Sequence, residues 1–326
     1  MLIKEGDTGP AVQLVQSHLR ELGYYRGSES GVGPGTAEAI RRFQRGQGLN
    51  PDGVVGPRTR ARLFPPLRFT REYLDAVLYG GRQVYDELDA VVAMVGVGEA
   101  GAFDALQLDG DGAGLSFGVL QWAQGPGSLQ PLLQAFHSAN EPKFIEILGD
   151  RDPLAARDLL AKTRGRGKKL ALWQDPWAWR FWLAGRDLEF QQVQRRLARW
   201  QLAALLEDGW RLYPQRFKPD GGIALRALMM MADVGNQAGP LGLKRALGAA
   251  ATGPADEARF IRALGGYVES IIRRKYGDPN FGNTCGRHEA ICRQYSLEKV
   301  DWPGLRARLA LENPEAGSPG CGQQQN

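Results

Sequence analysis

Apolar residues recur every three or four positions along the first part of the chain. One such run begins at Pro10 and stops at Gly23, a second covers about 35–46, and a third ends near Leu63. Proline suits the first turn of a helix and glycine suits its end, so these runs predict three short amphipathic helices. Helices of this length, joined by Gly/Pro turns, can bury one small core.

From Phe69 onward the same spacing predicts a mainly helical body. The stretches with this pattern are 71–98, 186–210, 222–235 and 256–276. Segment 102–123 breaks it, since alternating apolar residues on both sides of a Gly/Asp turn predict a short β-hairpin. The predicted fold class is mainly α (α+β), a small three-helix domain followed by a helical domain with one hairpin.

A Pro-Pro pair at 65–66 separates the two parts. We therefore predict domains at 1–64 and 69–326, joined by a linker at 65–68.

Residues 3–64 contain four motifs that are more specific than the helical spacing of apolar residues. They read G-D-x-G-x-x-V at 6–12, L-x-x-L-G-Y at 19–24, A-I-R-R-F-Q at 39–44 and D-G-V-V-G-P-x-T at 52–59. This layout resembles the three-helix peptidoglycan-binding domain found at the ends of many wall hydrolases. The resemblance implies bacterial peptidoglycan as the partner. Tyr24, Tyr25 and Asp52 are candidate contact residues on exposed loops.

Segment 95–122 places carboxyl groups in contrasting surroundings. Glu99 follows a strongly apolar helix at its C-terminal end, where the helix dipole and apolar neighbours both disfavour ionisation. Asp109 and Asp111 lie in a Gly-rich turn, where a hydrated carboxylate stays ionised. Glycoside hydrolysis requires one protonated and one ionised carboxyl group. The pattern predicts Glu99 as the general acid and an aspartate of the turn as its partner.

The turn and the strand after it resemble the lysozyme superfamily, which includes goose-type lysozymes, phage lysozymes and bacterial chitosanases. The run G-D-G-A-G-L-S-x-G at 110–118 is similar to the chitosanase turn. That likeness implies Asp111 as the base and Ser116 as the hydroxyl that positions water, while Asp109 stays a second candidate. Two departures are a Glu-to-Asp spacing of 12 residues, nearer to goose-type lysozymes, and Ser116 in place of threonine.

Two further runs resemble parts of these enzymes. The run 117–121 is similar to a strand of goose-type lysozymes, and 233–237 is similar to a later helix that closes the cleft in phage lysozymes and chitosanases. By this likeness Gln121, Asp233 and Gln237 are candidate substrate-binding residues.

Together the resemblances imply a modular peptidoglycan hydrolase, an endolysin-like muramidase, that cleaves the glycan strand by carboxylate acid/base catalysis. A lytic transglycosylase is an alternative, because it needs only Glu99. A non-catalytic wall-binding component of a phage or secretion system is another. The N-terminal domain argues against a chitosanase. No cofactor is expected.

Histidine and cysteine residues favour no metal enzyme. The three histidines are widely separated, whereas zinc peptidases need several clustered ligands. Cys285-x-x-His288-x-x-x-Cys292 has ligand-like spacing but no obvious fourth ligand, and the Gly/Asp turn lacks calcium ligands at Ala113 and Leu120. Three cysteines are too few for a disulfide framework. No metal is expected.

Charge and hydropathy affect the choice of partner and location. The net charge of +5 suits an anionic partner without choosing among wall, nucleic acid and membrane surface. Five basic residues cluster in one segment: Lys162, Arg164, Arg166, Lys168 and Lys169. With the wall resemblance, we expect peptidoglycan and no nucleic acid.

Location and oligomeric state are expectations of the same kind. No apolar run approaches the roughly 20 residues that span a bilayer, and no signal peptide is recognisable. We therefore expect no membrane insertion, a monomer, and action on the wall after phage-lysis release or non-classical export.

Overall fold

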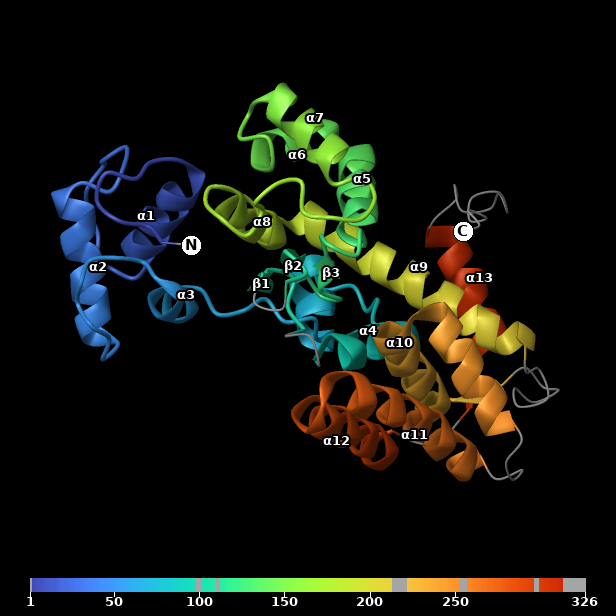
Figure 1. Cartoon of the computed structure of the whole chain (residues 1–326). Coiled ribbons are helices and arrows are strands. Elements are labelled where there is room, and N and C mark those ends of the chain that lie inside the picture. The colour runs from blue at the N-terminus through green and yellow to red at the C-terminus, as the bar shows by residue number, and fades with distance from the viewer. Residues whose placement is uncertain are drawn as a thin grey trace. The chain divides into compact units, whose positions relative to one another are not determined.

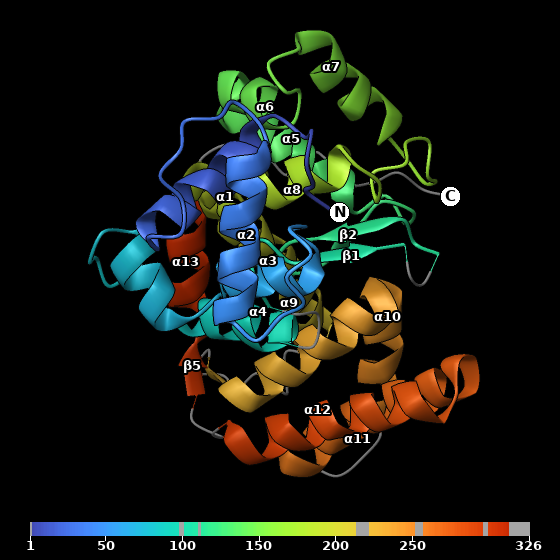
Figure 2. The ribbon, with the colours of Figure 1, turned by 90° about the vertical axis from the view of Figure 1, so that its left-hand side faces the viewer.

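The computed structural model describes residues 2–97, 101–109, 112–212, 222–251, 257–295 and 299–312 (Figure 1). Contacts divide the chain into two compact units. Unit 1 contains Met1–Arg68 and Ala102–Val193, and unit 2 contains Phe69–Gly101 and Gln194–Asn326. Helices predominate in both units and the strands are short (Figure 2), which confirms the predicted fold class. The domain boundaries at 64 and 69 stay a prediction.

Three helices form the first part of unit 1, as the periodicity predicts. They are α1 (Pro10–Glu21), α2 (Pro34–Gly46) and α3 (Pro57–Leu63). Each begins with a proline that follows a glycine, because the first turn of a helix needs no donor from that proline. Val15, Leu19, Ile40 and Phe43 pack into a common core from which water is almost excluded.

That core continues into α8 (Trp177–Arg186), which is distant in sequence. The rings of Phe64 and Trp182 meet edge to face, with centroids 5.0 Å apart. The indole nitrogen of Trp179 donates to the carbonyl of Leu2 at 3.2 Å. The two tryptophans therefore join the helical part of unit 1 to its N-terminal helices.

The predicted hairpin is present and carries a third strand. Strands β1 (Leu106–Leu108), β2 (Leu115–Phe117) and β3 (Trp122–Ala123) form an antiparallel sheet in the order β1-β2-β3. Leu108 pairs with Leu115, so residues 109–114 form the connection between β1 and β2. The helices α5 (Leu129–Ala139), α6 (Glu141–Ile147) and α7 (Pro153–Lys162), which periodicity did not predict, precede α8.

Unit 2 is a helical assembly with one small two-stranded sheet. Helix α9 (Leu188–Leu212) belongs to unit 2 from residue 194 onward. The other elements of unit 2 are η1 (Tyr73–Leu78), α4 (Glu87–Val97), β4 (Gly222–Ala224), α10 (Leu225–Ala251), α11 (Glu257–Tyr276), α12 (Asp278–Gln294), β5 (Lys299–Asp301) and α13 (Trp302–Glu312). Helices α10, α11 and α12 lie side by side in both views (Figures 1 and 2).

Glycines interrupt the helical structure of unit 2 at two places. Gly80 and Gly81 both have positive φ, and they separate η1 from α4 within 71–98. Gly239, with φ 71°, is followed by Pro240 and kinks α10. None of the described helices is both long enough and apolar enough to cross a bilayer.

Candidate functional site

The two main catalytic candidates, Glu99 and Asp111, lie outside the described residues. The structure describes only their neighbours in the chain. Helix α4 ends at Val97, and its residues Val91, Val92 and Val95 are at most 1% exposed. An apolar helix of this kind precedes Glu99 in the sequence, and the Gly-rich connection between β1 and β2 contains Asp111.

Asp109 opens that connection and is held by two partners. Its Oδ1 accepts from the backbone N–H of Gly114 at 2.7 Å, and both carboxylate oxygens bind the Lys168 ammonium at 3.0 and 3.1 Å. The Lys168 and Gly114 hydrogen bonds lower the pKa of Asp109 below its ordinary 3.8. The ionised Asp109 carboxylate fastens the turn through these bonds.

Ser116 lies within the small sheet, and Gln121 lies in the turn between β2 and β3. Ser116 is in the middle of β2, opposite Gln107 and Ala123, and only 5% of it is exposed. Gln121 has φ 50° and donates from Nε2 to the carbonyl of Gly118 at 2.9 Å. Ser116 thus belongs to the hairpin that contains Asp111, whereas Gln121 lies in the next turn, and the roles of both toward substrate and water stay predictions.

Asp233 and Gln237, both predicted to bind substrate, come together on α10. The Gln237 amide donates to the Asp233 carboxylate, and its oxygen accepts from the Thr284 hydroxyl at 3.2 Å. His288 Nε2 lies 3.0 Å from Asp233 Oδ2. Only 2% of Asp233 is exposed, so in this structure its carboxylate binds protein groups in the helix bundle.

The same histidine also contacts a second carboxylate. His288 Nδ1 lies 2.7 Å from Glu269 Oε1 on α11, so the ring joins α10, α11 and α12. A Cβ atom at Gly265 would stand 2.8 Å from Nδ1, so the glycine lets α11 approach the ring. Both ring nitrogens face carboxylate oxygens, and the charged imidazole can donate a hydrogen bond to each of them. The sequence spacing gave no sign of this bridge.

Stability should therefore depend on the charge of His288. Burial lowers its pKa, but Asp233 and Glu269 outweigh burial and raise it above the ordinary 6.5. Stabilisation by a group with a raised pKa is complete below 6.5 and is lost as pH rises through the folded-state pKa. We expect the free energy of unfolding of the wild type to fall with pH above 6.5 more steeply than that of His288→Gln. Urea unfolding between pH 6 and 9 measures both slopes; parallel curves would contradict the charged bridge.

A cavity of about 460 Å³ adjoins this histidine, and the two cysteine candidates line it. Cys285 and Cys292 are free thiols on α12. Burial and the neighbouring Glu269 raise the pKa of the Cys285 thiol, which opposes the thiolate that a metal or an electrophile requires. Within the described ranges, no three His, Cys, Asp or Glu residues are placed to hold a metal ion.

The candidates of the N-terminal domain differ in exposure. Asp52 is exposed as expected, although its Oδ1 accepts from Gln44 Nε2 and from the Val54 N–H. Tyr25, expected on an exposed loop, is 3% exposed, so this expectation is wrong. Its hydroxyl accepts from the Glu29 N–H and lies within hydrogen-bond distance of the Glu29 carboxylate. The tyrosine ring packs in the domain core because it closes the loop between α1 and α2.

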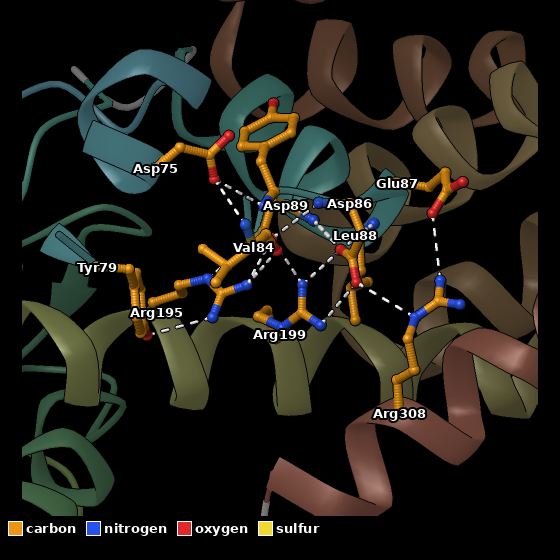
Figure 3. Close-up of polar contacts among 11 residues, drawn as sticks. Asp75, Tyr79, Val84, Asp86, Glu87, Leu88, Asp89, Arg195, Arg199 and Arg308 are labelled. Carbon is orange, nitrogen blue, oxygen red and sulfur yellow. Dashed lines mark hydrogen bonds and ion pairs between the residues drawn. The ribbon is translucent and has the colours of Figure 1, made fainter. Parts of the chain in front are cut away.

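A buried ionic cluster in unit 2 was missed at the sequence level (Figure 3). Arg195 of α9 binds Asp89 of α4 through two nitrogens, at 2.8 and 2.7 Å. Arg199, one turn later, binds Asp86 at 2.5 and 2.9 Å and Asp89 at 2.9 Å. Asp86 also accepts from the N–H groups of Leu88 and Asp89, so it caps α4. The cluster fixes the N-terminal end of the helix that precedes Glu99 in the sequence.

Comparison with known proteins identifies the N-terminal domain. Residues 8–63 match the family model "Putative peptidoglycan binding domain", which confirms the resemblance of this part. The spore cortex-lytic enzyme of Halalkalibacterium halodurans is 36% identical over 83 residues, 25% of each chain. That of Oceanobacillus iheyensis is 35% identical over 83 residues, 25% of this chain and 30% of the relative. The chain thus matches about a quarter to a third of the length of these relatives.

Among solved structures, a family 46 chitosanase of Gynuella sunshinyii in complex with chitotetraose is similar with a TM-score of 0.46. The two share 14% sequence identity, and the match covers 64% of this chain and 88% of the chitosanase chain.

Proposed function

We propose that this protein is a modular peptidoglycan hydrolase of the muramidase type, with a lysozyme-like catalytic part. The observation that carries the proposal is the peptidoglycan-binding match at 8–63 in the same chain as a glutamate after an apolar helix and an aspartate in a Gly-rich hairpin turn. Such a pair of carboxyl groups in contrasting surroundings fits glycoside hydrolysis. Relatives named as spore cortex-lytic enzymes support a substrate in the bacterial wall.

In the proposed reaction Glu99 protonates the oxygen of the glycosidic bond. Asp111 takes a proton from water, which then attacks the anomeric carbon, and the Ser116 hydroxyl orients that water. Asp109 does not fill the role of base equally well, because both of its oxygens already bind Lys168. A base that activates water between two separated carboxyl groups inverts the anomeric configuration, so we expect inversion.

The N-terminal domain contributes by holding the enzyme on an insoluble polymer. Tethering a catalytic part to a bound module raises the effective concentration of substrate at the site. Removal of residues 1–64 would also expose Trp179 and Trp182, which pack against this domain, so point variants test the binding better than truncation.

Mass spectrometry of products from purified sacculi tests the reaction type. Hydrolysis releases muropeptides with a reducing sugar end, and digestion in ¹⁸O-water adds one labelled oxygen to each new end. We expect labelled reducing ends, and we expect Asp111→Ala to lower their rate of release by about 10²–10⁴. Unlabelled 1,6-anhydro products with nearly full activity of Asp111→Ala would instead show a lytic transglycosylase that depends on Glu99 alone.

A further inference from the structure

An exposed basic segment begins at Lys162, the last residue of α7, and continues into a loop that contains Arg164, Arg166, Lys168 and Lys169. Three of these five cations have partners within the protein. Lys162 binds Asp158 at 2.9 Å, Lys168 binds Asp109, and Lys169 donates to the carbonyl of Arg164 at 3.3 Å. The side chains of Arg164 and Arg166 are exposed, and no acidic partner is found for either among the residues that the structure describes.

The loop is fastened to the segment that follows β3 and to the connection between β1 and β2. The N–H of Gly167 donates to the carbonyl of Gly125 at 2.9 Å, and Gln124 Nε2 donates to the carbonyl of Leu170 at 2.8 Å. Gly165 and Gly167 have φ of 72° and 115°, which residues with a side chain rarely adopt. Lys168 completes the attachment by binding Asp109, the residue that opens the connection between β1 and β2. The arginines are thus held beside that connection.

We propose that Arg164 and Arg166 bind the carboxylates of the peptide stems and so select a peptide-bearing, anionic glycan strand. The inference rests on the proposed function, because it places the loop beside the turn that contains Asp111. Peptide stems carry free carboxylates at intervals along the strand, and guanidinium groups bind carboxylates through two parallel hydrogen bonds. A cluster of like charge also attracts an oppositely charged polymer over several ångströms.

The three lysines that have partners and the two arginines have different roles in this proposal. Lys168 keeps the turn in place through Asp109, so its removal would alter the turn as well as the charge. The side chains of Arg164 and Arg166 have no acidic partner within the described part of the chain, which makes them suitable for substitution. The loop would favour an anionic strand over chitin, which is neutral, and over chitosan, which is cationic.

The test compares native sacculi with sacculi whose carboxylates have been converted to methylamides by a carbodiimide and methylamine. The variant is R164Q/R166Q in the full chain. The matched control is K244Q/R245Q, which removes two exposed cations from α10 and changes the net charge equally. We expect R164Q/R166Q to release soluble fragments from native sacculi about three- to tenfold more slowly than the wild type. On amidated sacculi, the variant and the wild type should release fragments at the same rate. The control should match the wild type on both substrates.

Several outcomes would overturn the proposal. One is an equal loss of rate by R164Q/R166Q on native and on amidated sacculi. Another is the same loss of rate by the control K244Q/R245Q on native sacculi. A third is loop-dependent binding of a single-stranded oligonucleotide at least as tight as binding of sacculi, which would assign the loop to nucleic acid.

Binding is measured separately from cleavage by sedimentation with sacculi. If the wild type cleaves no bond but its binding still depends on both the arginines and the carboxylates, the loop proposal is supported and the proposed function fails. If the wild type cleaves sacculi and the arginines change neither binding nor rate, the loop proposal fails and the proposed function is unaffected.

Discussion

Glu99→Gln should lower the rate of glycan cleavage by about 10²–10⁴, because glutamine has nearly the same size but cannot donate a proton to the leaving oxygen. The loss should appear in the clearing of permeabilised cells and in the release of new sugar ends from purified sacculi. Binding to sacculi should be unchanged, since the peptidoglycan-binding match lies at residues 8–63. An effect on rate without an effect on binding is the result expected of a general acid.

Glu72→Gln provides the matched control, because Glu72 is an exposed glutamate in the same unit. It should clear cells at the rate of the wild type. Equal clearing by Glu99→Gln and wild type would remove Glu99 from the mechanism. If neither the wild type nor Glu99→Gln cleared cells while both bound sacculi, the chain would be a non-catalytic wall-binding component.

The parts of the fold that depend on local pattern could be predicted from the sequence. The three N-terminal helices and the hairpin follow from spacing and turn residues within about 20 positions. Contacts between distant segments could not be predicted this way. The pairing of β4 (Gly222–Ala224) with β5 (Lys299–Asp301) and the Trp179 bond to Leu2 join segments whose own patterns contain no information about each other.

The sequence indicates candidate residue types for the site but not the partners of their side chains. The sequence indicates an ionised Asp109, but Lys168, which holds it, is 59 positions away. It also indicates Asp233 on a helix, but not the His288 bridge that uses its carboxylate. Tyr25 shows the same limit, since a tyrosine in a Gly-rich loop can point to solvent or close the core. Only the folded chain determines which of these polar groups remain available to a ligand.

One feature of the sequence indicates the ionic cluster of unit 2, although the spacing of apolar residues does not. Arg195 and Arg199 are four positions apart on α9, and Asp86 and Asp89 are three apart at the start of α4. Spacings of three and four place side chains on one face of a helix. Two arginines on the face that should pack inward indicate a charged interface. Two aspartates at the start of a helix carry the opposite charge, and one of them can cap that helix.

Arg199→Met should lower the free energy of unfolding by about 3–5 kcal/mol, which is the usual effect of removing one partner from a buried ion pair. Arg199 is fully buried and binds both Asp86 and Asp89, the second of which is 0% exposed. Burial raises the pKa of Asp86, but the Arg199 hydrogen bonds and charge outweigh it and hold the pKa below 3.8. Without Arg199 the Asp86 carboxylate loses that stabilisation, and two carboxylates share Arg195 in a region with little water.

Arg308→Met is the control, because Arg308 approaches the same carboxylate from an exposed position (Figure 3). Its Nε lies 3.8 Å from Asp86 Oδ2, and 51% of its side chain is exposed. Solvent screens such a pair, so the loss should stay below about 1 kcal/mol. Urea unfolding of the three proteins at pH 7 measures the difference.

On acidification, the stability that Asp86 contributes is lost as pH falls below 3.8 toward its lowered pKa. The difference in free energy of unfolding between the wild type and Arg199→Met should then narrow. Equal effects of the two substitutions would mean that the charges of the cluster are solvated, and that apolar contacts rather than ion pairs hold α4 against α9.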